Sequence, residues 1–156
     1  MANRFSLAMI VKDEERMLPD MLRSTRGLFD EIIIVDTGST DNTVAVATAA
    51  GAQVIHWEWQ NDFAAARNVS LQAVTGDWVA FFDADERLSL KLCRQLKRLV
   101  NSPQNIGSAT ITMRNSLPNG SFQDSQILRV FRHSPKIQFQ YRIHEEVCHS
   151  VQEFLE

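Results

Sequence analysis

The 156-residue sequence has few cysteines, no long apolar run and no excess of positive charge. Its two cysteines, Cys93 and Cys148, make neither a disulfide framework nor a C-x-x-C metal pair, which indicates small core or surface residues in a reducing compartment. No apolar run approaches the roughly 20 residues that span a bilayer, and the start lacks the apolar segment of a secretory signal. We therefore expect a soluble, cytoplasmic protein without a transmembrane segment.

Basic residues and glycine-rich phosphate loops are also scarce. Sixteen Lys and Arg residues against 19 Asp and Glu residues give a net charge of −3, so no overall positive field is available to hold a nucleic-acid backbone. We therefore expect no nucleic-acid partner. Neither G-x-x-x-x-G-K-[ST] nor G-x-G-x-x-G occurs, so a bound phosphate would not lie in a glycine cradle, and a metal ion is favoured in that role.

The sequence instead alternates between short apolar runs and segments in which apolar residues recur with the periodicity of an α-helix. The apolar runs are residues 5–11, 31–35, 52–57 and 77–82, and the helical segments lie near 17–25, 39–51 and 61–76. Apolar runs this short, bounded by polar residues, are typical of strands buried on both faces of a parallel sheet. The βαβαβαβ order predicts an α/β, doubly wound, Rossmann-like domain with helices on both faces of the sheet.

The pattern changes in the last third of the chain. Residues 88–100 predict an amphipathic helix with a basic, solvated face. Residues 108–114 and 126–131 predict two strands around a turn at 118–120. We expect these strands to form an antiparallel edge on the parallel sheet.

Acidic residues follow nearly every predicted strand. They are Asp13, Glu14 and Glu15 after the first strand, Asp36 after the second, Glu58 and Asp62 after the third, and Asp83, Asp85 and Glu86 after the fourth. Ligands of open α/β sheets bind beyond the carboxyl ends of the strands, so we expect these side chains on one rim. So many carboxylates would repel one another unless a cation lay among them. Their hard oxygens suit Mg²⁺ or Mn²⁺, and such an ion in turn suits a diphosphate.

Each of these motifs also has a purely structural interpretation. Asp83 and Asp85 can reach a metal and a ribose or a second water, or they can cap the following helix. Asp36 can accept hydrogen bonds from a base or sugar, or its turn can serve only to cap a helix. Arg67 can equally be an ordinary ion-pair arginine. His144, beside a glutamate, offers a metal ligand next to a general base, or it is a structural histidine.

Two further groups of side chains have no definite role. Trp57, Trp59 and Phe63 would form an apolar patch if they are exposed. The basic residues near the C-terminus indicate an anionic acceptor, the donor phosphates or a solvated edge; they are Arg129, Arg132, Lys136 and Arg142.

Four segments, in this order, resemble family 2 glycosyltransferases of the GT-A fold. They are residues 9–15 (MIVKDEE), 35–41 (VDTGSTD), 66–68 (ARN) and 76–86 (GDWVAFFDADE). Residues 143–146 (IHEE), preceded by 128–132 (LRVFR), resemble the branch of core-oligosaccharide and peptide glycosyltransferases. The resemblance implies inverting transfer of a sugar from a nucleotide-diphosphate donor, most often UDP-linked, to a glycan, lipopolysaccharide-core or peptide acceptor.

The resemblance also implies roles for single residues. It assigns the nucleotide-sugar site to Val11, Glu14, Asp36, Arg67, Asp83 and Ala84. It assigns a divalent cation, Mn²⁺ or Mg²⁺, to Asp85 as the principal ligand, with Asp83 and His144. An inverting displacement needs a base on the face opposite the leaving diphosphate, so one carboxylate must stay free of the metal. Glu145 is the first candidate for this catalytic base and Glu86 the second.

Two other functions stay open beside the transferase. One is a nucleotide-sugar-binding module without independent turnover. The other is a Mg²⁺-dependent nucleotidyltransferase or phosphotransferase, which is less favoured because a D-x-D phosphatase carries its pair after the first strand. We expect one GT-A-like domain over residues 1–156, in which 1–101 bind the nucleotide and 102–156 begin an acceptor portion whose remainder is missing. A peripheral membrane contact and the oligomeric state stay open.

Overall fold

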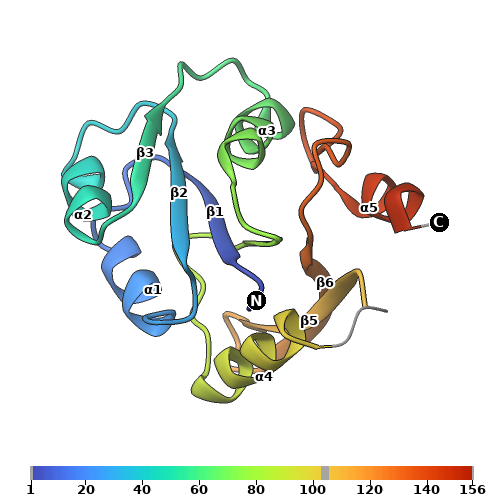
Figure 1. The fold of residues 1–156 in the computed structure, drawn as a ribbon. Helices are drawn as coiled ribbons and strands as arrows, with labels where there is room; N and C mark the ends of the chain where they lie inside the picture. Colours follow the sequence, from blue (N-terminus) through green and yellow to red (C-terminus); the bar gives the residue numbers. More distant parts are fainter. Residues whose placement is uncertain (1, 103–105, 156) are drawn as a thin grey trace.

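Six strands form a single sheet in the order β3-β2-β1-β4-β6-β5 (Figure 1). The computed structural model describes residues 2–102 and 106–155. Its elements are β1 (Phe5–Val11), α1 (Leu18–Ser24), β2 (Glu31–Asp36), α2 (Thr43–Ala49), β3 (Gln53–His56), α3 (Phe63–Ala73), β4 (Trp78–Phe81), α4 (Leu90–Val100), β5 (Ser108–Ser116), β6 (Phe122–Arg132) and α5 (Cys148–Leu155). The first four strands are parallel, and β6 runs antiparallel to both β4 and β5. The predicted α/β fold with an antiparallel edge is confirmed.

Helices cover both faces of the sheet. This cover buries the apolar side chains of β1, which point alternately to the two faces. Phe5, Leu7 and Met9 point into a core shared with α1, α2 and α4. Ala8 points to the opposite face and joins a core shared with α3 and α5. Successive strand side chains face opposite sides, so a strand with both sides covered is apolar throughout.

The second helix begins later than the sequence indicates. Its expected capping residues instead connect the loop after β2 to the loop after β1. Asp13 accepts a hydrogen bond from the Thr40 amide at 2.7 Å, and the Ser39 hydroxyl accepts one from the Asp13 amide at 2.9 Å. The Thr43 hydroxyl accepts one from the Glu14 amide at 2.7 Å. These bonds hold the two loops together at the carboxyl ends of neighbouring strands.

The C-terminal segment returns to the sheet. After β6, residues 133–147 cross the α3 face, and α5 buries Val151 in the second core. Sequence reasoning did not predict α5. Among residues 2–102 and 106–155, no helix is long and apolar enough to cross a membrane.

Candidate donor-binding cavity

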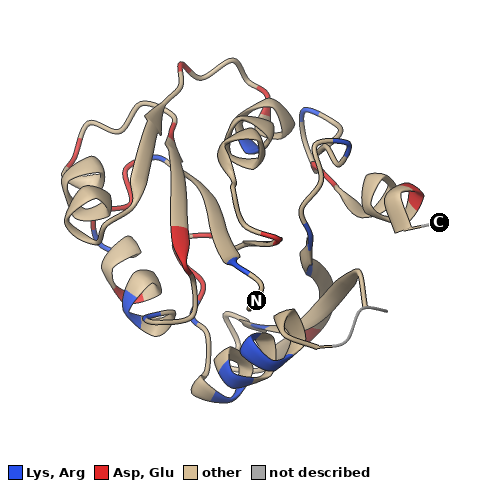
Figure 2. Ribbon diagram, in the orientation of Figure 1, with Lys and Arg blue, Asp and Glu red and all other residues tan. Residues whose placement is uncertain are grey.

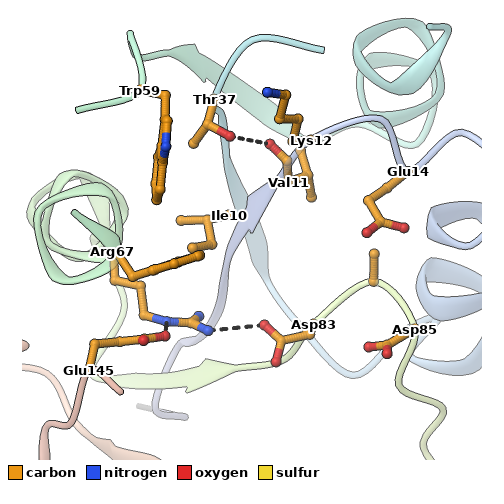
Figure 3. A pocket seen from close by; sticks show the side chains of 12 residues that line it. Ile10, Val11, Lys12, Glu14, Thr37, Trp59, Arg67, Asp83, Asp85 and Glu145 are labelled. Atoms are coloured by element: carbon orange, nitrogen blue, oxygen red, sulfur yellow. Dashed lines mark hydrogen bonds and ion pairs between the residues drawn. The ribbon is translucent and has the colours of Figure 1, made fainter. Parts of the chain in front are cut away.

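A cavity of about 520 Å³ lies at the carboxyl ends of β1, β2 and β4 (Figure 3). It is open to solvent where the strand order reverses, since β2 and β4 flank β1. Ligands of open α/β sheets bind at this place. Its lining residues come from five parts of the chain: Ile10, Val11, Lys12 and Glu14; Thr37; Trp59, Phe63 and Arg67; Asp83, Ala84 and Asp85; and Glu145. We call it the donor cavity.

One wall of the donor cavity is aromatic. Trp59 and Phe63 meet edge to face, with ring centroids 4.8 Å apart, and Phe63 is 41% exposed. Trp57 and Trp59 also meet edge to face, but both are half-buried, so only Phe63 of the three is exposed. Trp59 and Phe63 line the cavity. An aromatic wall beside Ile10 and Val11 suits a flat, partly apolar group such as a nucleobase.

Arg67 joins three elements beneath the cavity. Its Nε donates to Glu145 Oε1 at 2.7 Å, and its Nη2 donates to Asp83 Oδ1 at 3.0 Å. Its guanidinium carbon also lies 6.0 Å and 5.7 Å from the ring centroids of Phe81 and Phe139. Arg67 is thus an ion-paired arginine that also lines the cavity, and the structure brings it together with Asp83 and Glu145.

Asp83 is held in its ionised form by two arginines. Burial disfavours its charge, but the guanidinium groups of Arg67 and Arg129 outweigh burial and lower the pKa of Asp83. Arg129 Nη2 lies 3.4 Å from the second oxygen of Asp83. Both carboxylate oxygens of Asp83 are therefore engaged with cationic side chains.

Glu14 and Asp85 face one another across the opposite end of the cavity (Figure 3). Partial burial, followed by the charges of Asp85, Asp41 and Asp83, raises the pKa of Glu14. Asp85 is exposed, and its side chain makes no hydrogen bond or ion pair with any other described residue. This end of the cavity therefore has accessible carboxylate oxygens and an unbalanced negative charge.

These carboxylates suit a divalent cation that also binds a ligand. In the described parts of the chain, no three His, Cys, Asp or Glu side chains are placed to hold a metal ion by themselves. Mg²⁺ and similar ions are commonly held by one or two carboxylates together with substrate phosphates and water. Asp85, with Glu14 opposite it, fits such a site.

Three of the expected site residues lie outside the lining of the donor cavity. Asp36 is 3% exposed and accepts hydrogen bonds from the Gly38 and Ser39 amides at 3.2–3.3 Å, so its carboxylate shapes the loop. Glu86 accepts from the Asp83 amide at 2.9 Å and from Arg129 at 2.5 Å. Burial, its largest influence, raises the pKa of Glu86. His144 is exposed and adopts a left-handed backbone with φ 57°.

Sequence reasoning gave no site role to five residues that line the cavity: Ile10, Lys12, Thr37, Trp59 and Phe63. Thr37 directly follows Asp36, and its hydroxyl donates to the Val11 carbonyl at 3.1 Å. A signal existed for Trp59 and Phe63, because both lie in or just after the loop that follows β3, and ligands bind at the carboxyl edge of a parallel sheet. No comparable signal marked Ile10, which belongs to an apolar strand.

The fold and the cavity define an α/β domain with an open cavity at the carboxyl ends of its parallel strands and carboxylates at one end of that cavity. Residues 6–151 match the family model described as Glycosyl transferase family 2, and the chain belongs to this family. The resemblance seen in the sequence is thereby confirmed.

Similar proteins extend this assignment. The chain is 42% identical over 146 residues to a TPR repeat-containing protein of Synechococcus elongatus, covering 94% of the chain and 36% of that protein. It is 28% identical to the SPbeta prophage-derived glycosyltransferase SunS of Bacillus subtilis, covering 88% of the chain and 33% of that protein. The chain thus spans about a third of the length of these relatives.

A solved structure with bound ligands also resembles part of this chain. It is glucosyl-3-phosphoglycerate synthase of Mycobacterium tuberculosis in complex with Mn²⁺ and UDP-glucose. The identity is 27% and the TM-score 0.56, over 69% of this chain and 42% of that chain.

Proposed function

We propose that the protein transfers a sugar from a nucleotide-diphosphate donor, with a UDP-sugar as the first candidate, to an acceptor hydroxyl with inversion and with a divalent cation. The observation that carries this proposal is the donor cavity, which combines an aromatic wall with the accessible carboxylates of Glu14 and Asp85 at its other end. A nucleoside diphosphate matches this arrangement, because its flat base suits the aromatic wall and its phosphates bind cations, which the carboxylates at the other end would also bind. The Mn²⁺ and UDP-glucose complex of the mycobacterial relative supports the choice of donor.

In this proposal, Val11, Thr37 and Trp59 border the nucleoside, and Asp85 is the principal protein ligand of the cation. Asp83 and Ala84 lie between these two parts of the cavity. The cation would neutralise negative charge on the diphosphate. Asp36 and His144 stay predictions as ligand-binding residues, since neither lines the cavity.

Glu145 is the proposed catalytic base. Arg67 fixes one of its oxygens, while Oε2 has no partner among the described residues. Glu145 would take the proton of the acceptor hydroxyl as that oxygen bonds to the anomeric carbon. The bond from that carbon to the diphosphate would break as the new bond forms, and its electron pair would leave with the nucleotide. Glu86 fits the role less well, because both of its oxygens are engaged.

Calorimetric titration of UDP-glucose and UDP-N-acetylglucosamine, with and without Mn²⁺, tests this proposal. We expect Mn²⁺-dependent binding that weakens about tenfold or more in Asp85→Asn, which loses a charged ligand. Asp124→Asn, which removes an exposed carboxylate from β6, is the matched control and should bind normally. If neither nucleotide binds in the presence of Mn²⁺, the proposal fails and the phosphotransfer alternative regains support.

Sugar transfer separates an enzyme from a binding module. Glu145→Gln should keep donor binding and lose transfer to any acceptor that the wild type uses, and NMR of the product should show an inverted anomeric centre. Full transfer by Glu145→Gln would remove this residue from the role. Mn²⁺-dependent donor binding without transfer or donor hydrolysis in the wild type would favour the binding module.

A further inference from the structure

Lys12 and Thr37 lie side by side on the part of the donor cavity that is away from Asp85 (Figure 3). β1 and β2 pair in parallel with Val11 opposite Asp36, and Lys12 and Thr37 each follow directly after this pair. Neighbouring strands are about 4.8 Å apart, so the two side chains can reach adjacent atoms of one base. In the proposed function this is the nucleoside side, because a cation at Asp85 draws the diphosphate to the other side.

The carboxylate of Asp36 is not free to contact a base on this side. Asp36 is buried and lies outside the cavity lining. Its Oδ1 accepts from the Ser39 amide at 3.2 Å, and its Oδ2 accepts from the Gly38 amide at 3.3 Å. His56 Nδ1 also lies 3.5 Å from Oδ2. A side chain that distinguishes one base from another must therefore be a different one.

Lys12 supplies a free hydrogen-bond donor. Its side chain is exposed and makes no hydrogen bond or ion pair with any described residue, whereas Arg67, the other cation of the lining, is already ion-paired. The backbone on both sides of Lys12 is held, because the Val11 carbonyl accepts from the Thr37 amide at 3.0 Å and the Asp13 amide donates to a hydroxyl of the next loop at 2.9 Å. An ammonium group only donates, so it can bind a ring carbonyl but not an amino group.

Thr37 supplies a free acceptor beside this donor. Its hydroxyl oxygen lies 3.1 Å from the Val11 carbonyl oxygen, and because a carbonyl has no hydrogen, the hydroxyl is the donor in this contact. The single hydrogen of the hydroxyl is therefore used, and the oxygen keeps lone pairs that can accept. Trp59 adds no free donor, since its indole N–H already donates to Asn61 Oδ1 at 3.2 Å.

A donor beside an acceptor matches uracil and not cytosine. Uracil has the carbonyl oxygen O4 next to N3–H, which is an acceptor followed by a donor. Cytosine has the amino group N4 next to an unprotonated N3, so its order is reversed. This edge of either ring points away from the nitrogen that carries the ribose, and thus away from the diphosphate. The ring of Trp59 stacks on any base, so it does not distinguish the two.

We propose that Lys12 and Thr37 select a uracil nucleotide, with Lys12 donating to O4 and the Thr37 hydroxyl oxygen accepting from N3–H. This inference rests on the proposed function and assigns the choice of the base to these two residues. A cytidine nucleotide would place its amino group against the ammonium group and its N3 lone pair against the hydroxyl oxygen. Polar groups left unmatched in this way discriminate far more strongly than stacking does.

Calorimetric titration of UDP and CDP in the presence of Mn²⁺ tests this inference. The measured quantity is the ratio of the two dissociation constants, which cancels any change in the shared ribose and diphosphate contacts. We expect the wild type to bind UDP about tenfold or more tightly than CDP, the effect of a hydrogen bond to a charged group. Lys12→Met and Thr37→Val should each lower this ratio to about threefold or less, whereas Lys12→Arg and Thr37→Ser should keep most of it.

Two matched controls make the same changes outside the cavity lining. Lys97→Met removes an exposed lysine of α4, and Thr110→Val removes an exposed hydroxyl of β5, so neither should change the ratio. Thr37→Val also leaves no buried acceptor unpaired, because the Val11 carbonyl keeps the backbone amide of residue 37 as its donor.

Each other outcome removes one of the two proposals. If neither UDP nor CDP binds with Mn²⁺, the proposed function fails. If the wild type binds both equally, or if the ratio survives in Lys12→Met or in Thr37→Val, the inference fails and the proposed function stands. If Lys12→Met weakens UDP and CDP by the same factor, Lys12 contacts a phosphate or the ribose, and its assignment to the base is wrong.

Discussion

At the residue scale, the ionised side chain of Glu14 opposes folding. Partial burial, and then the charges of Asp85, Asp41 and Asp83, raise its pKa above the ordinary value of 4.5. A carboxyl group with a raised folded-state pKa stabilises the protein below its ordinary pKa, and that contribution is lost as the pH rises through the raised value. A cation bound beside Glu14 would relieve this repulsion.

We therefore expect Glu14→Gln to increase the free energy of unfolding at pH 7 by about 0.5 kcal/mol, a figure kept small because water screens a part-buried group. At pH 4 the variant and the wild type should be nearly equal, because Glu14 is then largely protonated. Thermal unfolding at both pH values measures this difference. Glu58→Gln, which removes an exposed acid outside the cavity lining, is the control and should change little. A Glu14→Gln protein less stable than the wild type at pH 7 would contradict the prediction.

The positions of some site residues could be predicted from the sequence, because they follow from the sheet topology, whereas the contacts of others depend on the path of the folded chain. Asp83, Asp85 and Glu14 directly follow strands of one parallel sheet, so their convergence follows from topology. The pairing of Arg67 with Glu145 joins positions 78 residues apart and depends on the path of the chain after β6. The contacts of Asp36 were not predictable from its position, because the turn through Gly38, with φ 107°, directs two backbone amides onto its carboxylate.

At the element scale, the short connection between α3 and β4 leaves no room for a side chain. A Cβ atom at Gly76 would lie 2.3 Å from Ser6 Oγ and 3.0 Å from the Arg4 carbonyl oxygen. The Gly76 amide also donates to Ser6 Oγ at 3.2 Å. The close approach ties the start of β4 to the start of β1.

We expect Gly76→Ala to lower the free energy of unfolding by about 1–3 kcal/mol, because the added methyl group overpacks this contact. Urea unfolding of the variant measures the loss. In Ser6→Ala the obstructing hydroxyl is absent, so the double variant should lose less than the sum of the two single losses. Strict additivity would show that Ser6 is not the obstacle.

Element positions were more predictable than element ends. Four apolar runs marked β1 to β4, although β3, at the edge of the sheet, has no fully buried residue. The start of α2 moved to Thr43 because Ser39 and Thr40 bond with Asp13 in the neighbouring loop, a tertiary contact that local capping preferences do not contain. The eight-residue α5 is too short to display several helical periods, so its packing against the sheet determines it.

At the scale of the whole molecule, charge is strongly segregated. Residues 87–123 contain six of the 16 basic residues and none of the 19 acidic ones. Basic residues gather along α4 (Figure 2). Lys91, Arg94, Lys97 and Arg98 are all exposed, and Leu90 at the start of the same helix is 74% exposed. A cationic face with an exposed apolar residue is suited to an anionic membrane surface.

The last prediction concerns this face. We expect the protein to bind vesicles that contain phosphatidylglycerol and not vesicles of phosphatidylcholine alone. Each basic residue near an anionic surface contributes about 1 kcal/mol, so changing Arg94, Lys97 and Arg98 to Gln should weaken binding roughly 100-fold. The matched control changes three exposed basic residues elsewhere, Arg16, Arg26 and Lys136, to Gln and has the same net charge. Co-sedimentation at increasing salt measures both variants.

The two triple variants distinguish a specific face from overall charge. If the α4 face makes the contact, the control should bind almost as well as the wild type, and 1 M salt should release all bound protein because the Debye length falls from about 10 Å at 0.1 M to about 3 Å. Equal weakening in both variants would show that net charge alone controls binding. Leu90→Ser should also weaken vesicle binding, because it removes an apolar contact and leaves the charge unchanged. The factor by which it weakens binding should not depend on the salt concentration. Binding that withstands both the α4 changes and 1 M salt would place the membrane contact on another part of the molecule.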